Sequence, residues 1–215
     1  MKKLFIFDFD GTLFDSVADV VICFNETLEI HNFPTLTREE YLECLGGNID
    51  GIVSLVLGEN STDENVKTVK NTYLNIHDSC KKENTVPFPK ASQTLKKLQD
   101  RGILLAINSN RLNYSLNEFV EKFFSDIDFL EIEGHDEINP SKPNPYGVEK
   151  IIRKAGVDKS EAVYIGDSKT DIQTAKNAGI DCIVVKWGYG NQNDYEDDYI
   201  LKAIDSYEEL FDYVS

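Results

Sequence analysis

The sequence predicts an α/β protein in which a parallel sheet carries helices on both faces and a small all-helical cap is inserted after the first strand. Three observations lead to this prediction. A short apolar run at residues 4–7 is typical of a strand buried on both faces, and it leads directly into two aspartates. Residues 17–82 contain no convincing strand. From residue 91 onward, helical and strand-like segments alternate, which is typical of a Rossmann-like fold.

The expected helical cap spans residues 16–85, and the expected Rossmann-like catalytic core comprises residues 1–15 and 86–215. Apolar side chains recur at helical spacing in the first part of the cap. Two segments of the form Ser/Thr-x-x-Glu, which begin at Thr37 and Ser61, are capping boxes that open helices. The helices expected in the cap cover residues 17–32, 37–45, 49–57 and 61–82.

The elements of the core follow from two different periodicities. Its strands are short runs rich in β-branched and other large apolar residues, and its helices carry apolar residues three and four positions apart. Gly156 and Gly179 follow two of these helices and are typical C-terminal stops. The expected strands after the first cover residues 103–107, 129–132, 162–165 and 182–185, and the expected helices cover residues 91–100, 112–124, 145–155 and 170–178.

Composition narrows the range of functions. The chain of 215 residues has a formal net charge of −16, which argues against nucleic acid or an anionic membrane as a partner. An anionic substrate would need local positive charge or a metal ion. The four cysteines show neither a Cys-x-x-Cys pair nor a metal-like spacing with the histidines, so we expect reduced thiols in a cytoplasmic protein. The apolar run before Asp8 is too short for a signal peptide.

Polar residues suited to one site follow several of the expected strands or lie in adjoining loops. In a parallel sheet the carboxyl ends of the strands share one edge, so residues far apart in the sequence can converge there. Each fragment alone has an ordinary structural explanation: a lone Asp-x-Asp is usually solvated, a lone Ser is often a helix cap, and a Lys between prolines is often exposed. The ordered set is much more specific. Its members are Asp8, Asp10, Ser109, Asn110, Lys142, Asp167 and Asp171.

This ordered set resembles the haloacid dehalogenase superfamily, in the phosphatase branch that carries a helical cap after its first motif. The segment Trp187-Gly188-Tyr189-Gly190 is similar to the phosphoglycolate-phosphatase-like members of that branch. The resemblance covers most of the core, whereas the cap resembles the family only in position and helicity. The four matching segments are Asp8-Phe9-Asp10-Gly11-Thr12-Leu13, Ser109-Asn110, Lys142-Pro143-Asn144-Pro145, and Gly166-Asp167-Ser168 with Asp171.

The resemblance implies a Mg²⁺-dependent phosphatase that hydrolyses a small phosphorylated metabolite, with a phosphoglycolate-like substrate favoured. Asp8 is expected to attack phosphorus and form an aspartyl phosphate. Asp10 is expected to protonate the leaving oxygen and then to take a proton from water, and a carboxylate-rich site could keep it partly protonated. Mg²⁺, a hard cation that prefers oxygen ligands, would be held by Asp8, Asp167 and the backbone carbonyl of Asp10.

The remaining residues are expected to support this chemistry. Ser109 and Asn110 would bind the phosphoryl group, the latter through its backbone N–H, and Lys142 would supply fixed positive charge. Asp171 would orient either the side chain of Lys142 or the groups that bind the metal. Arg111 follows the second motif, where many relatives carry Lys. Contact with the substrate and exposure to solvent are both open for its side chain, and exposure to solvent is favoured.

Two other functions stay open for this fold. A phosphosugar mutase is one, although relatives of that kind usually carry Val where this chain has Thr12. A non-catalytic member that binds a phosphorylated ligand or a protein partner is the other, and it is disfavoured because no catalytic position is missing. We expect a monomer that acts on a small phosphorylated metabolite, with no nucleic acid and no membrane as partner.

Overall fold

The computed structural model describes residues 1–136 and 138–214 of the chain. The chain divides into two compact units. The core unit comprises Met1–Phe14 and Pro87–Ser215, and the helical unit comprises Asp15–Val86. The chain leaves the core unit through β2 (Phe14–Asp15) and returns through β3 (Val86–Pro87), and these two short strands pair with each other.

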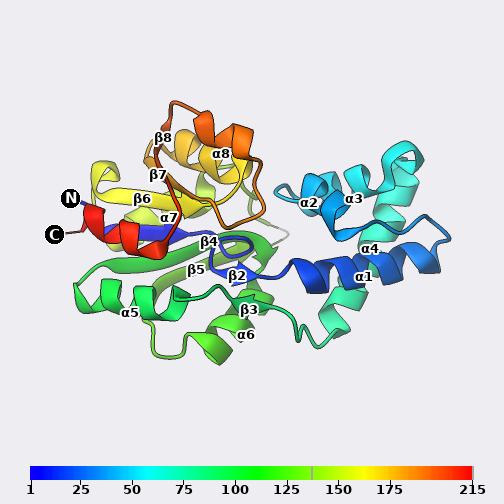
Figure 1. Ribbon diagram of the computed structural model, residues 1–215, viewed down its shortest axis with the longest axis horizontal. Coiled ribbons are helices and arrows are strands. Elements are labelled where there is room, and N and C mark those ends of the chain that lie inside the picture. The colour runs from blue at the N-terminus through cyan, green and yellow to red at the C-terminus, as the bar shows by residue number, and fades with distance from the viewer. Residues whose placement is uncertain (137, 215) are drawn as a thin grey trace. The chain divides into compact units, whose positions relative to one another are not determined.

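A six-stranded sheet with the order β5-β4-β1-β6-β7-β8 forms the centre of the core unit (Figure 1). Every neighbouring pair of strands is parallel, which confirms the predicted fold class. The first strand lies in the middle of the sheet, and all four of its residues are fully buried, as its unbroken apolar sequence predicts. The strands are β1 (Leu4–Phe7), β4 (Leu104–Leu112), β5 (Phe129–His135), β6 (Ala162–Gly166), β7 (Asp181–Val185) and β8 (Ile200–Ile204).

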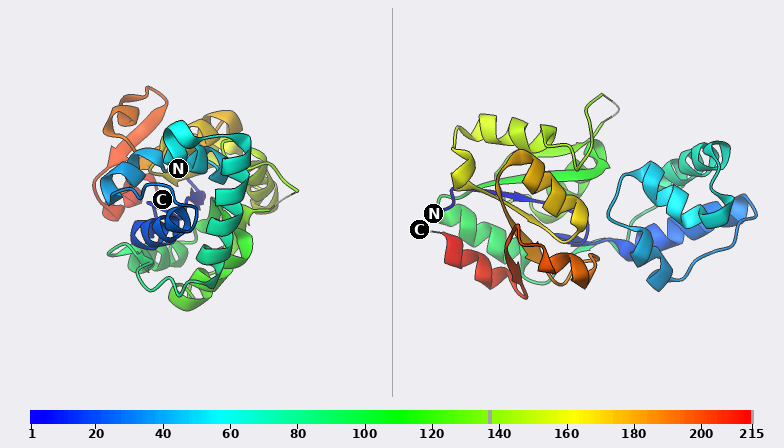
Figure 2. Two further views of the ribbon diagram at one scale, coloured as in Figure 1. Left: turned by 90° about the vertical axis from the view of Figure 1, so that its right-hand side faces the viewer. Right: turned by 90° about the horizontal axis from the view of Figure 1, so that it is seen from above.

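Helices cover both faces of this sheet (Figure 2). Because side chains alternate along a strand, Leu4 and Ile6 of β1 pack on one face with α7 and α8. Phe5 and Phe7 pack on the other face with α5, α6 and the C-terminal 3-10 helix η4. Each fully buried side chain of this size contributes about 1.5–3 kcal/mol through the hydrophobic effect. The helices of the core unit are α5 (Ala91–Asp100), α6 (Asn113–Phe123), α7 (Tyr146–Ala155), η2 (Lys159–Glu161), α8 (Lys169–Ala178), η3 (Gln192–Glu196) and η4 (Tyr207–Tyr213).

The core unit ends with two elements that were not predicted, β8 and η4. β8 is an edge strand whose Leu201 and Lys202 are exposed, so it lacks the apolar run that identifies the central strands. In η4, Leu210 is fully buried against the sheet. The Lys2 N–H donates a hydrogen bond to the Tyr213 carbonyl over 3.0 Å, so the two ends of the chain lie side by side (Figure 2).

Several predicted boundaries shift in the structure. The strand expected at residues 103–107 continues to Leu112, so Ser109 and Asn110 lie within β4 rather than after it. The capping box at Thr37 is confirmed, because its side chain and that of Glu40 satisfy each other's backbone N–H groups. The box predicted to begin at Ser61 is wrong by one residue: the Thr62 side chain caps the helix instead.

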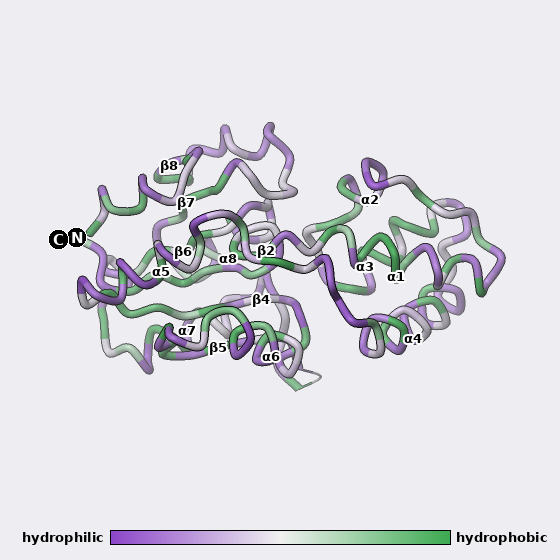
Figure 3. The backbone as a smooth tube through the Cα atoms, turned by 60° about the horizontal axis from the view of Figure 1, so that its bottom comes forward, coloured by the Kyte–Doolittle hydropathy of each residue, from purple (hydrophilic) through white to green (hydrophobic). Residues whose placement is uncertain are grey.

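The helical unit packs four α-helices around its own apolar cluster. Phe24 and Tyr73 stack at its centre with their ring centroids 3.8 Å apart. Buried Asp19 accepts hydrogen bonds from the Asn84 amide groups and the Thr85 hydroxyl, which fixes the segment that leads out of the unit. Figure 3 shows hydrophobic and hydrophilic residues alternating along α4, as expected of a helix buried on one side only. The helices are α1 (Val17–Ile30), α2 (Arg38–Cys44), α3 (Ile49–Leu57), η1 (Gly58–Asn60) and α4 (Asp63–Ser79).

Within the part of the chain that the structure describes, every helix is too short or too polar to cross a membrane.

Candidate active site

The predicted site residues gather at the carboxyl edge of the central strands. Asp8 directly follows β1, Ser109 lies near the end of β4, and Asp167 directly follows β6. β4 and β6 flank β1 on opposite sides, so the strand order reverses its direction beside β1. Ligands of open α/β sheets bind at such a point.

Lys142 lies at the centre of this group. Its ammonium donates one hydrogen bond to Asp8 Oδ1 and one to Asp171 Oδ1, each over 2.7 Å. All three side chains are buried. The lysine comes from the loop between β5 and α7, which the sequence analysis had placed at the same edge.

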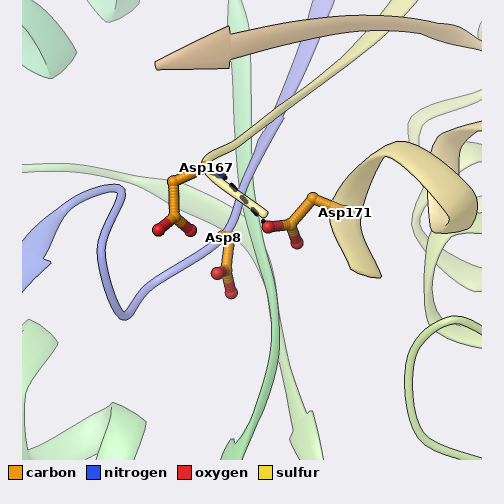
Figure 4. Close-up of side chains that lie close together, drawn as sticks. All are labelled: Asp8, Asp167 and Asp171. Carbon is orange, nitrogen blue, oxygen red and sulfur yellow. Dashed lines mark hydrogen bonds between the residues drawn. The ribbon is translucent and has the colours of Figure 1, made fainter. Parts of the chain in front are cut away.

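Asp171 belongs to the first turn of α8, where it forms a capping box with Ser168. Its Oδ2 accepts from the N–H groups of Asp167 and Ser168 and from the Ser168 hydroxyl, and its Oδ1 accepts from Lys142. Figure 4 shows the bond to Asp167 and places Asp8 and Asp167 beside this helix end. Asp171 therefore orients both Lys142 and the backbone that carries Asp167.

Three carboxylates and one ammonium leave this buried cluster with excess negative charge. Burial, with the nearby Asp171 carboxylate, raises the pKa of Asp8 from its ordinary 3.8 to about 7, although Lys142 opposes the shift. Burial and the Asp171 and Asp8 carboxylates also hold the pKa of Asp167 well above its ordinary range. Burial would lower the pKa of Lys142, but Asp171 and Asp8 together raise it well above its usual value. The cluster is thus suited to bind additional positive charge.

The donor set fits a hard divalent cation. One oxygen from each of Asp8, Asp167 and Asp171 can be chosen so that all three lie within 4.8 Å of one another. Both oxygens of Asp171 already accept hydrogen bonds from the protein, which leaves Asp8 and Asp167 as the better placed ligands. An all-oxygen set of few carboxylates, completed by water and substrate, is typical of sites for such cations.

Three glycines make room for Asp167, two of them for its carboxylate and one for its backbone carbonyl. A Cβ atom on Gly11 would lie 2.3 Å from Asp167 Oδ2, and one on Gly188 would lie 2.5 Å from the same oxygen. A Cβ on Gly190 would lie 1.8 Å from the Asp167 carbonyl oxygen. The Tyr189 N–H donates to Asp167 Oδ2 over 2.6 Å. The segment Trp187–Gly190, noted in the sequence only as a similarity, therefore encloses and orients this carboxylate.

Ser109 and Asn110 contribute through different groups. The Asn110 side chain accepts from the Lys142 N–H over 2.8 Å and donates to the Lys142 carbonyl over 3.2 Å, so it holds the peptide group of the lysine. Ser109 is buried, and its oxygen accepts from the Arg111 N–H over 3.1 Å, which leaves its hydroxyl proton to donate elsewhere. That these residues bind a phosphoryl group stays a prediction.

The expectation that Arg111 faces solvent is wrong. Its side chain is only 7% exposed, and its guanidinium forms an ion pair with Asp10. Asp10 therefore has an arginine as a partner, whereas the sequence predicts only carboxylates as its charged neighbours. The two residues are far apart in the chain, and no local pattern marks them as a pair.

Residues 5–185, which include all the site segments except Trp187–Gly190, match the family described as haloacid dehalogenase-like hydrolases. The chain belongs to this family. The match confirms the resemblance inferred from the four motifs.

Individual members of the family are similar over nearly the whole chain. A phosphoglycolate phosphatase from Aquifex aeolicus is 28% identical over 214 residues, covering 98% of this chain and 97% of that protein. A phosphoglycolate phosphatase from Pseudomonas syringae pv. tomato is 29% identical over 98% of this chain and 79% of its own length. The crystal structure of a predicted phosphoglycolate phosphatase from Lactobacillus delbrueckii subsp. bulgaricus superposes with a TM-score of 0.91, at 28% identity and with complete coverage of both chains. At this level the predicted enzyme class, a phosphatase of the haloacid dehalogenase family, is confirmed.

Proposed function

We propose that the protein is a Mg²⁺-dependent phosphatase that hydrolyses a small phosphorylated metabolite through an aspartyl phosphate on Asp8. A phosphoglycolate-like compound is the favoured substrate, because the similar proteins named above act on phosphoglycolate or are predicted to do so. The enzyme acts as a monomer in the cytoplasm.

One observation carries this proposal: buried Lys142 contacts both Asp8 and Asp171, and Asp167 lies beside them. A phosphate monoester is an anion, and an aspartate can attack it only if nearby positive charge offsets their repulsion. Lys142 supplies one such charge directly at the attacking carboxylate. The excess of negative charge in the cluster favours a divalent cation, which Asp8 and Asp167 would hold.

The residues divide the reaction into two steps. An Asp8 oxygen attacks phosphorus, the bond to the leaving oxygen breaks, and Asp10 gives that oxygen a proton. Water then attacks the aspartyl phosphate, Asp10 takes a proton from it, and inorganic phosphate leaves. Ser109 and Lys142 hold the phosphoryl oxygens during both steps. When bound, Mg²⁺ supplies charge neutralisation for the phosphoryl group, and Asp8, Asp167 and the Asp10 carbonyl would hold it.

The test is phosphate release from phosphoglycolate, nucleoside monophosphates, sugar phosphates and pyrophosphate, with and without Mg²⁺. We expect turnover of at least one compound that disappears in excess chelator. Asp8→Asn should lower it by at least about 10³-fold, since the nucleophile is lost. Asp100→Asn, a change of the same kind at an exposed position of α5, should leave it unchanged.

Two results would contradict the proposal. Full activity of Asp8→Asn would exclude the aspartyl phosphate, and full activity in chelator would exclude the metal. Conversion of a phosphosugar to its isomer without release of phosphate would identify a mutase instead. Binding of phosphorylated compounds without any turnover would identify a non-catalytic member of the family.

A further inference from the structure

Asp10 and Arg111 are joined by a two-pronged ion pair within the core unit. Arg111 Nη2 donates to Asp10 Oδ1 over 2.6 Å, and Arg111 Nε donates to Asp10 Oδ2 over 3.0 Å. Two bonds of this kind fix both the position and the plane of a carboxylate. The Asp10 side chain is 32% exposed and that of Arg111 only 7%, so the carboxylate keeps an accessible side while its partner does not.

The guanidinium is itself held firmly by the core. It lies over the rings of Phe9 and Phe119, with its central carbon 5.2 Å and 5.5 Å from their centroids. Its Nη1 donates to the hydroxyl of Ser115, a buried residue of α6, over 3.4 Å. Because an arginine packed over two aromatic rings has few alternative conformations, it forms a rigid support for the more exposed Asp10.

We propose that Arg111 is a positioning residue, which aims the Asp10 carboxyl group at the leaving oxygen of the substrate. The proposal rests on the function proposed above. The arginine donates one hydrogen bond to each oxygen of Asp10. In the first step the Asp10 carboxyl group carries the proton that it gives to the leaving oxygen, and in the second step the resulting carboxylate accepts a proton from water. Small errors in such an alignment lower the rate of proton transfer strongly.

This role differs from a role in binding the phosphoryl group. A phosphate-binding arginine would assist every phosphate ester to a similar extent. An arginine that aims the proton donor assists only those esters whose leaving group needs a proton. Alkyl alcohols are poor leaving groups as anions, whereas p-nitrophenolate leaves without protonation. The dependence on the leaving group therefore separates the two roles.

The experiment compares kcat/KM for p-nitrophenyl phosphate with kcat/KM for the best alkyl phosphate of the panel. The ratio kcat/KM reports on the steps up to departure of the leaving group, so the later use of Asp10 as a base does not enter it. We expect Arg111→Met to lower the value for the alkyl phosphate by about 100-fold, within the range that general acids contribute. The value for p-nitrophenyl phosphate should fall by no more than about threefold on the same reasoning.

Two further variants make the test specific. Arg111→Lys keeps the positive charge but loses the planar guanidinium group that donates two parallel hydrogen bonds. It should therefore lower kcat/KM for the alkyl phosphate selectively, but by a smaller factor than Arg111→Met does. If Arg111→Met does not fold, Arg111→Lys serves as the test variant in its place. Arg101→Met removes an arginine that lies over the Phe211 ring at 4.5 Å, away from the site, and should leave both values unchanged.

Equal losses on both esters would overturn the proposal and assign Arg111 to phosphoryl binding or to stability, and no loss on either would show that the pair plays no part in the reaction. The wild-type enzyme is measured first. Absence of turnover there on both esters would refute the proposed function, whereas turnover with no selective loss would refute only the role of Arg111.

Discussion

Lys142 shows how single residues of this site depend on one another. Its ammonium is buried against Asp8 and Asp171, and its peptide group is held by the Asn110 amide. Removing one partner of a buried ion pair leaves the other charge uncompensated, which costs about 3–5 kcal/mol. Lys142 is therefore needed for the stability of the cluster as well as for its proposed chemistry, and substitutions there cannot separate the two.

Substitution of Thr12 tests the contribution of one buried hydroxyl to the stability of the protein. Thr12 is fully buried, and its hydroxyl is the only buried side-chain polar atom within the described residues for which the structure shows no hydrogen-bond partner. Val has nearly the same shape and lacks the hydroxyl. We expect Thr12→Val to raise the free energy of unfolding by about 1 kcal/mol, because an unsatisfied hydroxyl is no longer buried. Urea unfolding followed by circular dichroism measures this difference, and a loss of stability would show that the hydroxyl has a partner, such as a buried water.

The sequence identified the residues of this site to different degrees. Asp8, Lys142, Asp167 and Asp171 could be predicted to meet, and the structure brings all four together. Asp8 and Asp167 follow strands, Asp171 lies in the first turn of the helix after one, and Lys142 lies in an adjoining loop. The partner of Asp10 could not be predicted. Arg111 lies about a hundred positions away, and its burial depends on rings from two other elements, which local patterns do not reveal.

At the scale of elements, the loop after β7 connects the site with the rest of the core. Trp187 Nε1 donates to the Thr12 carbonyl over 3.2 Å, and its ring packs on Tyr207 with the centroids 4.4 Å apart. Two residues later, the Tyr189 N–H binds the Asp167 carboxylate. The loop is thus anchored at one end and holds a proposed metal ligand at the other.

Gly188, which lies between Trp187 and Tyr189 in this loop, should be sensitive to substitution. A Cβ on Gly188 would lie 2.3 Å from Asp167 Cβ and 2.5 Å from the Gly11 carbonyl, so Gly188→Ala must displace Asp167 or the loop. We expect the affinity for Mg²⁺, measured by isothermal titration calorimetry, to fall by about 10-fold or more, as when groups that orient metal ligands are lost. Gly47→Ala is the matched control, because a Cβ there meets open space. Unchanged affinity in Gly188→Ala would show that this loop does not position the metal ligand.

Elements with strong local signals were predicted well, and those that depend on tertiary packing were not. β1 is identified by its unbroken apolar run, and the helix at Thr37 by its capping box. The edge strand β8 and the short helix η4 have no such signal. They are stabilised by the sheet against which they pack, as Ile204 and Leu210 show by their complete burial there.

At the scale of the whole molecule, the formal net charge of −16 favours proton and cation binding in general. Negative charge is concentrated in the buried cluster of Asp8, Asp167 and Asp171, so proton and cation binding are favoured there in particular. Because the pKa of Asp8 in the folded protein, about 7, lies above its ordinary 3.8, the folded state holds a proton that the unfolded state lacks between these two pH values. The corresponding stability is fully present below about pH 4 and is lost as the pH rises through 7.

This sign leads to a prediction about metal removal. In chelator, the melting temperature of the wild-type protein should fall between pH 5 and pH 8, and it should fall by more than that of Asp8→Asn. The variant lacks the titrating carboxyl group, but its negative charge otherwise rises with pH in the same way.

Mg²⁺ competes with protons for the same carboxylates, so it should raise the melting temperature at pH 8 much more than at pH 5. Asp167→Asn, which removes a proposed ligand, should reduce this rise. Differential scanning calorimetry measures all three proteins under the same conditions. A rise of equal size at both pH values, or one that persists in both variants, would place the cation away from this cluster.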